Sequence, residues 1–271
     1  MLGKLIKYHF KSVSEYFLPI FVGIGGFSIL YFILGLLNGP NMDNVIFGEN
    51  GNGVLGIVYI LSTVAFFFVI VALALGSSII MVYHFYRKYV SVEAYLTLTL
   101  PAKPWQHVFS MMVVGAIWKL LSMVVCLSAV FLVGFSFVGV SGLRDIFREI
   151  FGGAVSFDYL FNSIVSEMGL DFTTAVLTFL DILISLFSTN LICFAALSLG
   201  QMSKSHKVMM AVLWFIAMNM IVSTLTDSLT IFSDAQSFNG IFLMGIAINL
   251  VTSVVYFVIT NWVLEKKVNL E

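Results

Sequence analysis

Six long apolar runs, separated by polar or glycine-rich segments, dominate this chain of 271 residues. A membrane-spanning helix needs about 20 predominantly apolar residues to cross about 30 Å of hydrocarbon. The composition agrees, because 60% hydrophobic and 10% charged residues are more typical of a membrane protein than of a soluble domain. We therefore expect an all-α polytopic membrane protein with a single transmembrane domain over 1–271. Its spans are predicted at residues 17–37, 54–83, 109–140, 173–199, 208–225 and 240–263.

The positively charged residues predict the orientation of these spans, since Lys and Arg in short loops remain on the cytoplasmic side of a membrane. Ten cations flank the side that carries both termini, and only Arg144 and Arg148 flank the other side. Both termini are therefore expected in the cytoplasm. With a formal net charge of -1, the chain has no basic patch or stripe that would indicate a nucleic-acid partner. The ten cations are Lys4, Lys7, Lys11, Arg87, Lys88, Lys103, Lys204, Lys207, Lys266 and Lys267.

The N-terminal residues before the first span form an amphipathic pattern of their own. Three lysines share one helical face and apolar residues occupy the other, which is typical of a helix on an anionic membrane surface. An ordinary positive flank of the first span explains the same residues equally well. Because the following run has full membrane length and no A-x-A site, we expect it to be retained rather than cleaved. The two faces consist of Lys4, Lys7 and Lys11, and of Leu2, Leu5, Ile6 and Val13.

A polar interruption at 84–107, between the second and third spans, is the most distinctive segment of the chain. Ser91 can cap a short helix, and Glu93 then lies in the first turn, where a negative charge suits the helix dipole. Pro101 ends that helix, because the residue before a proline is pushed away from α geometry. Pro104 suits the first turn of the third span. We expect a short helix that continues into an extended tail, a small polar-faced structure suited to docking of a soluble protein.

The residues from Glu93 to Pro101 read E-x-Y-L-T-x-T-L-P, with a cationic F-Y-R-K before them and a short K-K-x-N-L-E tail at the end of the chain. In these features the chain resembles the six-span permease subunits of bacterial ATP-binding-cassette exporters of the type-2 permease family, especially those of Firmicutes. The resemblance implies an elbow helix at 1–16, a coupling helix that docks into a separate ATPase, and a location in the bacterial cell membrane. The docking residues would be Glu93, Tyr95, Leu96, Thr97 and Pro101.

The same resemblance implies a function. A second permease copy or a related permease would complete a central pathway, and ATP with Mg would bind to the partner ATPase. The exporter would move a peptide-like or amphiphilic substrate out of the cell. The chain has no G-x-x-x-x-G-K-[ST] loop to cradle phosphates, so we expect it to be a transporter subunit without its own cofactor. An intramembrane enzyme is disfavoured, because the chain has no G-x-G-D or zinc signature and no candidate catalytic residue is identified.

Two ionisable residues, Lys119 and Asp181, fall within predicted spans, where each costs roughly 2.5 to 3.5 kcal/mol at a helix centre on insertion scales. Three interpretations remain open: a structural pair, a polar lining of the substrate path, or a misjudged helix end from which Lys119 reaches the interface. They also define an alternative function, an ion-coupled secondary transporter in which both residues act as coupling groups.

The histidines and cysteines do not indicate a metal site. All four histidines lie near the predicted cytoplasmic boundary, and none stands in a spacing such as H-E-x-x-H, so we interpret them as interfacial residues. The cysteines fall inside predicted spans and are interpreted as small core residues. These residues are His9, His84, His107 and His206, and Cys126 and Cys193.

The segment 141–172, between the third and fourth spans, is expected outside the cell. It carries an amphipathic helical pattern that ends at Gly152 and Gly153, followed by a second apolar stripe. We interpret the two stripes as interfacial helices on the outer surface rather than as a lid over an export path. In the family that the chain resembles, the prominent extracellular helices lie instead between the last two spans. The first pattern consists of Ile146, Phe147, Ile150 and Phe151 against Arg144, Asp145, Arg148 and Glu149, and the second of Leu160, Phe161, Ile164, Val165 and Met168.

Overall fold

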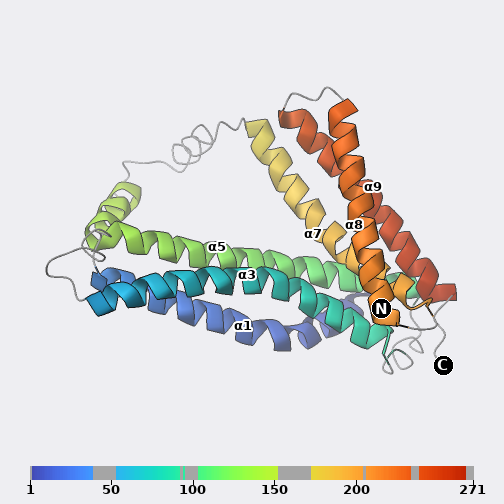
Figure 1. Cartoon of the computed structure of the whole chain (residues 1–271), viewed down its shortest axis with the longest axis horizontal. Helices are drawn as coiled ribbons and strands as arrows, with labels where there is room; N and C mark the ends of the chain where they lie inside the picture. Colours follow the sequence, from blue (N-terminus) through green and yellow to red (C-terminus); the bar gives the residue numbers. More distant parts are fainter. Residues whose placement is uncertain are drawn as a thin grey trace. The chain divides into compact units, whose positions relative to one another are not determined.

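The computed structural model of the chain consists of long helices, and no strand occurs in the part that it describes (Figure 1). The structure describes residues 2–38, 53–91, 94, 103–151, 172–203, 206–232 and 238–266. The helices are α1 (Leu2–Asn38), α3 (Gly53–Tyr89), α5 (Pro104–Phe151), α7 (Phe172–Gly200), α8 (Lys207–Phe232) and α9 (Phe238–Lys266).

Within the described residues, six helices are long and apolar enough to cross a membrane, which agrees with the six predicted spans and with the all-helical class. The second span is longer than expected, because α3 continues through Arg87 and Lys88 to Tyr89. Cations in the last turn of a helix are favoured by the helix dipole, so these residues extend the helix rather than end it. The apolar stretches are Leu2–Gly35, Ile60–Tyr89, Pro104–Gly134, Phe172–Gly200, Lys207–Leu229 and Asn239–Lys266.

The segments expected around the spans differ in how much of them the structure describes. The elbow at 1–16 is not a separate helix, because α1 runs without a break from Leu2 to Asn38. The coupling segment is described only up to Ser91, at Ala94 and from Lys103 onward, and Ala94 N–H donates to Ser91 C=O at 2.8 Å. The first stripe of 141–172 belongs to α5, which ends at Phe151, and the second lies outside the described residues.

The chain divides into two compact units, and the boundary between them passes through α1, α3 and α5. Unit 1 comprises Met1–Ser14, Ser78–Lys119 and Met168–Glu271, and unit 2 comprises Glu15–Ser77 and Leu120–Glu167. In α1 the boundary lies beside Glu15, whose carbonyl has no helical donor because Pro19 lacks an N–H. A proline therefore accompanies the transition from one unit to the other.

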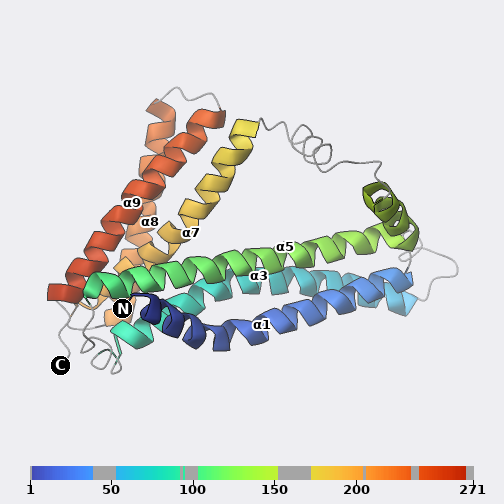
Figure 2. The same cartoon turned by 180° about the vertical axis from the view of Figure 1, so that it is seen from behind.

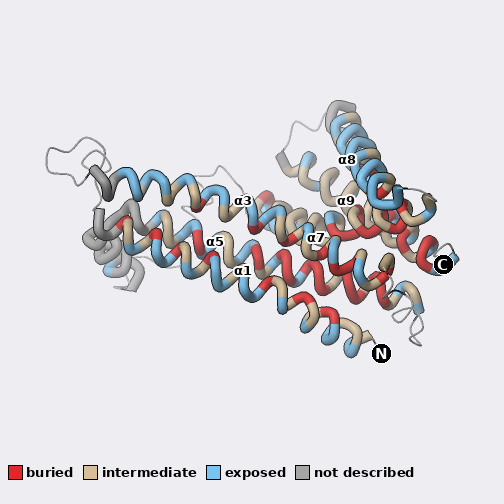
Figure 3. Tube along the Cα trace, turned by 60° about the horizontal axis from the view of Figure 1, so that its bottom comes forward, coloured by how far each residue is buried: buried red, intermediate tan, exposed pale blue. Residues whose placement is uncertain are grey.

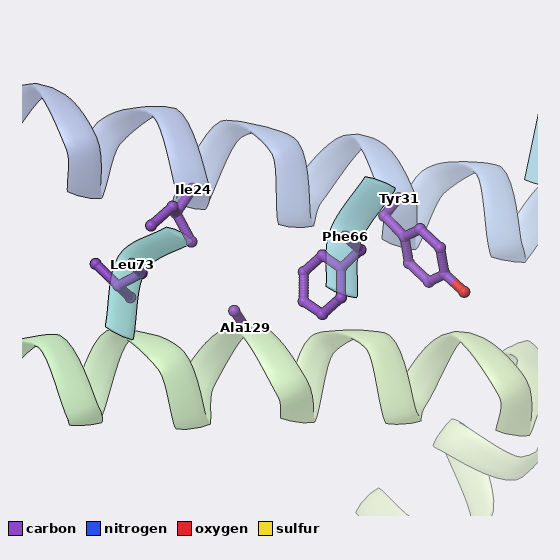
Figure 4. Packing of buried hydrophobic residues seen from close by; sticks show 5 residues of the cluster. All are labelled: Ile24, Tyr31, Phe66, Leu73 and Ala129. Atoms are coloured by element: carbon purple, nitrogen blue, oxygen red, sulfur yellow. The ribbon is translucent and has the colours of Figure 1, made fainter. Parts of the chain in front are cut away.

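Unit 2 has an apolar core formed by three helices. Ile24 and Tyr31 of α1 pack with Phe66 and Leu73 of α3 and with Ala129 of α5, and Figure 4 shows Ile24 beside Leu73 and Phe66 beside Tyr31. The rings of Tyr31 and Phe66 stack with centroids 5.6 Å apart. Small and large side chains thus interlock in this core.

In unit 1, α7 packs against both α8 and α9, and Figure 2 shows the three helices side by side. Two side-chain hydrogen bonds join α7 to α9: Thr174 Oγ1 donates to Asn239 Oδ1 at 2.6 Å, and Asn249 Nδ2 donates to Asp181 Oδ1 at 3.1 Å. The C-terminal half of α7 is buried, whereas α8 is exposed along most of its length (Figure 3).

The turn between α7 and α8 depends on a close approach at Gly200. A Cβ atom on Gly200 would lie 2.7 Å from the Ala211 Cβ and 2.8 Å from the Ala211 backbone nitrogen. Glycine is required here because backbone atoms cannot move aside as the end of a flexible side chain can. After the turn, His206 adopts a left-handed conformation with a φ of 55° before α8 begins.

Candidate functional site

The segment expected to dock an ATPase lies between the end of α3 and the beginning of α5, and the structure describes both of these helix ends. The docking residues themselves lie outside the described residues. On the far side, α5 begins at Pro104 as predicted, since the missing N–H of proline costs nothing in a first turn. The Gln106 side chain accepts a hydrogen bond from Lys103 N–H at 3.3 Å, which satisfies a donor at the helix start. The docking residues are Glu93, Tyr95, Leu96, Thr97 and Pro101.

A buried cluster of three histidines and one tyrosine joins these helix ends to the beginning of α1. The Tyr89 hydroxyl lies 3.3 Å from His9 Nε2 and 3.3 Å from His107 Nδ1. The His84 ring stands edge-on to the His9 ring, with centroids 5.7 Å apart. The four side chains, which we call the His–Tyr cluster, are 0% to 6% exposed.

Helical spacing explains how each helix presents its member of the cluster. On α1, His9 and Val13 are one turn apart on a buried face. On α3, the spacing of Phe85 and Tyr89 puts both rings on one side, and both are 0% exposed. On α5, His107 begins a buried stripe that continues along the helix. Three unrelated sequence segments therefore contribute to one site inside unit 1.

Aromatic stacking connects the surroundings of the cluster to α7 and α5. Phe85 of α3 stacks on Phe194 of α7 with ring centroids 4.3 Å apart and an interplanar angle of 12°. Phe10 of α1 stacks on Trp118 of α5 at 4.8 Å. Each stacked pair is worth about 0.5 to 1.5 kcal/mol beyond the burial of its area, so α3 is joined to α7 and α1 to α5 within unit 1.

Lys119 and Asp181 have different partners in the structure. Lys119 is 8% exposed and interacts electrostatically with the Cys193 side chain. Asp181 accepts its hydrogen bond from Asn249 of α9. Asp181 and Cys193 are both on α7, and their sequence separation corresponds to about 18 Å along a helix. The structure thus does not bring Lys119 and Asp181 together as a direct pair.

The His–Tyr cluster was not identified from the sequence, where the histidines were interpreted one at a time. His206 is exposed, whereas the other three are buried together. The available signal was that His84 and His107 border the same polar interruption and that His9 shares a helical face with Val13. Within the described ranges, no three His, Cys, Asp or Glu side chains are arranged to hold a metal ion.

Comparisons of this chain with protein-family models, with curated protein sequences and with solved structures give no match. The sequence pattern between α3 and α5 and the geometry of unit 1 therefore carry the functional argument.

Proposed function

We propose that this chain is the membrane-spanning permease subunit of an ATP-binding-cassette exporter, powered by a separate ATPase that docks on the segment around Glu93. The observation that carries the proposal is the E-x-Y-L-T-x-T-L-P sequence, placed between two apolar helices. The exporter moves a peptide-like or amphiphilic substrate out of the cell, and a second permease copy or a related chain completes the pathway.

The anchoring of the segment supports this role. Tyr89 ends α3 and bonds to His107, the fourth residue of α5, so the two ends of the segment are tied together. Phe85 extends the connection to Phe194 of α7. Close-packed side chains transmit displacement rather than absorb it. A partner that moves the docking segment would therefore move three helix ends of unit 1 as one body.

The absence of a phosphate-binding loop from the sequence also fits a subunit that relies on another chain for energy. In this proposal ATP and Mg bind to the ATPase alone. The apolar helices supply surfaces for lipid and for an amphiphilic cargo, and none of the residues named here carries out covalent chemistry.

Co-purification tests the proposal directly. The protein is isolated from its native membranes in mild detergent, and the associated soluble chains are identified by mass spectrometry. A stoichiometric partner that carries a G-x-x-x-x-G-K-[ST] loop is the expected result. Recovery of the folded membrane protein without such a chain would count against an ATP-driven permease.

Variants then locate the docking surface. Charge reversal with truncation, Glu93→Lys with Tyr95→Ala, should abolish recruitment of the ATPase and ATP-dependent transport in vesicles. The matched control is Glu265→Lys, which makes the same charge change at an exposed position on α9. If the double variant recruits the ATPase as well as the control does, the docking segment lies elsewhere.

The alternative function is an ion-coupled secondary transporter. Asp181 favours it, because this carboxylate lies within the apolar stretch of α7 and accepts a hydrogen bond from Asn249 of α9. Such a transporter would keep working after ATP depletion and would stop when the ion gradient is dissipated. Asp181→Asn should then abolish coupling, whereas in an ATP-driven permease it should leave ATP-dependent transport in place.

A further inference from the structure

The hydrogen bonds of the His–Tyr cluster restrict its protonation. The Tyr89 hydroxyl has one proton and lies within hydrogen-bonding distance of a nitrogen from each of His9 and His107. It can donate to one ring and accept from the other while both rings are neutral. If both rings were protonated, both nitrogens would donate to the same oxygen and the Tyr89 proton would lose its acceptors. The observed arrangement therefore suits neutral histidines.

Within the described residues, no opposite charge beside His9 compensates for an added proton. The groups that act electrostatically on His9 there are His84 and Lys88 of α3 and His107 of α5, and no carboxylate is among them. From α7, the neighbouring contact is the Phe194 ring on Phe85. A buried cation without an opposite charge is costly, because burial disfavours the charged form.

His107 provides a place for an additional proton. Its Nε2 atom is buried and has no hydrogen-bond partner among the described residues, and the whole side chain is 1% exposed. When Nδ1 donates to Tyr89, Nε2 carries a free lone pair. The cluster thus has a basic nitrogen that can be protonated, in a position where the resulting charge is unfavourable.

We infer that the His–Tyr cluster is a proton-binding site that holds the beginning of α1 against the adjoining ends of α3 and α5 when it is neutral and releases α1 when it is protonated. The released form exposes the histidines to water, where a histidine binds a proton at about pH 6.5. Because the released form binds more protons, acid shifts the equilibrium toward it. The closed form is fully stable above about pH 6.5 and loses stability as the pH falls below that value.

The test measures opening at a single thiol in the full-length protein in lipid nanodiscs. Val13→Cys places the thiol at a position that is 0% exposed, one helical turn from His9, in a background with Cys126→Ala and Cys193→Ala. Its labelling rate is divided by the rate in denaturant at the same pH, which cancels the ionisation of the thiol. The ratio reports the equilibrium for exposing this part of α1.

We expect the ratio to increase at least about fivefold from about pH 6.5 to about pH 5.5, because a single histidine that binds its proton at about pH 6.5 only in the released form gives that factor over this interval. A second thiol, Thr260→Cys on α9, is also 0% exposed and should stay slow to react. A ratio at Val13→Cys that does not change with pH would overturn the inference. An equal increase at Thr260→Cys would overturn it too, because the whole protein would then be opening.

Histidine variants identify the proton-binding groups. The triple variant His9→Gln, His84→Gln and His107→Gln keeps hydrogen-bonding side chains but should remove the pH dependence. If the triple variant does not fold, His9→Gln alone should reduce the slope of the logarithm of the labelling ratio against pH by about one proton. The matched control is His206→Asn, at an exposed residue whose left-handed backbone asparagine tolerates, and it should keep the wild-type slope. An unchanged slope in the His9→Gln variant would exclude His9 as a proton-binding group of the cluster.

The experiment needs no ATPase, so its outcome is independent of the proposed function.

Discussion

The two compact units are both helical and apolar, but they are held together in different ways. Unit 2 interlocks aliphatic and aromatic side chains around Phe66, and Tyr31 adds a hydrogen bond between its hydroxyl and Thr63 Oγ1 at 2.9 Å. Unit 1 combines close backbone approach at Gly200 with hydrogen bonds between helices, such as those of Tyr89 and Asp181.

This difference is instructive, because lipid tails are as apolar as the side chains that they would replace. Within a bilayer, helices associate through shape-dependent packing and through hydrogen bonds rather than through the hydrophobic effect. Unit 2 relies mainly on the first contribution, and unit 1 uses both. Only the second can respond to protonation or charge, so we expect regulation and coupling to reside in unit 1.

The largest effect should come from removing a ring of the unit 2 core. Phe66 is 6% exposed and stacks with Tyr31, so Phe66→Ala leaves a cavity and should lower the free energy of unfolding by about 3 kcal/mol. The matched control is Phe68→Ala, at a ring that is 65% exposed, with an expected change of less than about 0.5 kcal/mol. Steric trapping in bicelles measures both values. Equal losses would mean that the described core does not hold unit 2 together.

A smaller effect is expected from adding one methyl group to unit 1. In Gly200→Ala the new Cβ would clash with the Ala211 backbone, and separating α7 from α8 should cost about 2 kcal/mol. Gly76→Ala in unit 2 is the control, because nothing lies within 4 Å of its added Cβ. That variant should be neutral or slightly more stable, since alanine favours helix. Thermal unfolding in detergent would show the contrast, and equal melting temperatures would contradict the close approach.

The hydrogen bond between Asn249 of α9 and Asp181 of α7 should contribute less to the free energy of unfolding. Asp181→Ala removes the acceptor of Asn249 and should destabilise unit 1 by about 1 kcal/mol, the range measured for hydrogen bonds between helices in membranes. Asp181→Asn keeps an oxygen acceptor at the same place and should recover most of that loss. Unfolding free energies of the two variants in bicelles distinguish them. Equal loss in both would mean that the charge, rather than the bond, stabilises the contact.

The smallest effect is expected at the Tyr31 hydroxyl. Tyr31→Phe removes the bond to Thr63 but keeps the ring stacked on Phe66, so the free energy of unfolding should fall by only about 0.6 kcal/mol. The same bicelle measurement applies. A loss as large as that of Phe66→Ala would show that unit 2 also depends on polar bonds, and the contrast between the units would disappear.

Local features of the sequence predicted the elements and several of their ends. The number of spans follows from apolar length, and the start of α5 at Pro104 follows from the chemistry of a first helical turn. The second span is predicted over 54–83, whereas α3 continues to Tyr89 with Arg87 and Lys88 in its last turn.

Side-chain partners were predicted less well. Opposite charges at similar depth favour a pair of Lys119 and Asp181, but Asp181 accepts its hydrogen bond from Asn249, and no ion pair joins it to Lys119 among the described residues. The three histidines of the cluster come from distant segments, and no local pattern relates His9 to His107. The docking residues around Glu93 remain a prediction from sequence resemblance.

The sequence by itself determined that this chain forms apolar helices, that six of those described are long enough to cross a membrane, and that Pro104 begins one of them. These properties depend on side-chain hydrophobicity and on backbone chemistry within a few residues. Only the tertiary structure decided that Tyr89 lies between His9 and His107 and that Gly200 touches Ala211. Such contacts depend on the rotation and depth of each helix against its neighbours, and in a bilayer the shapes of many side chains set these together.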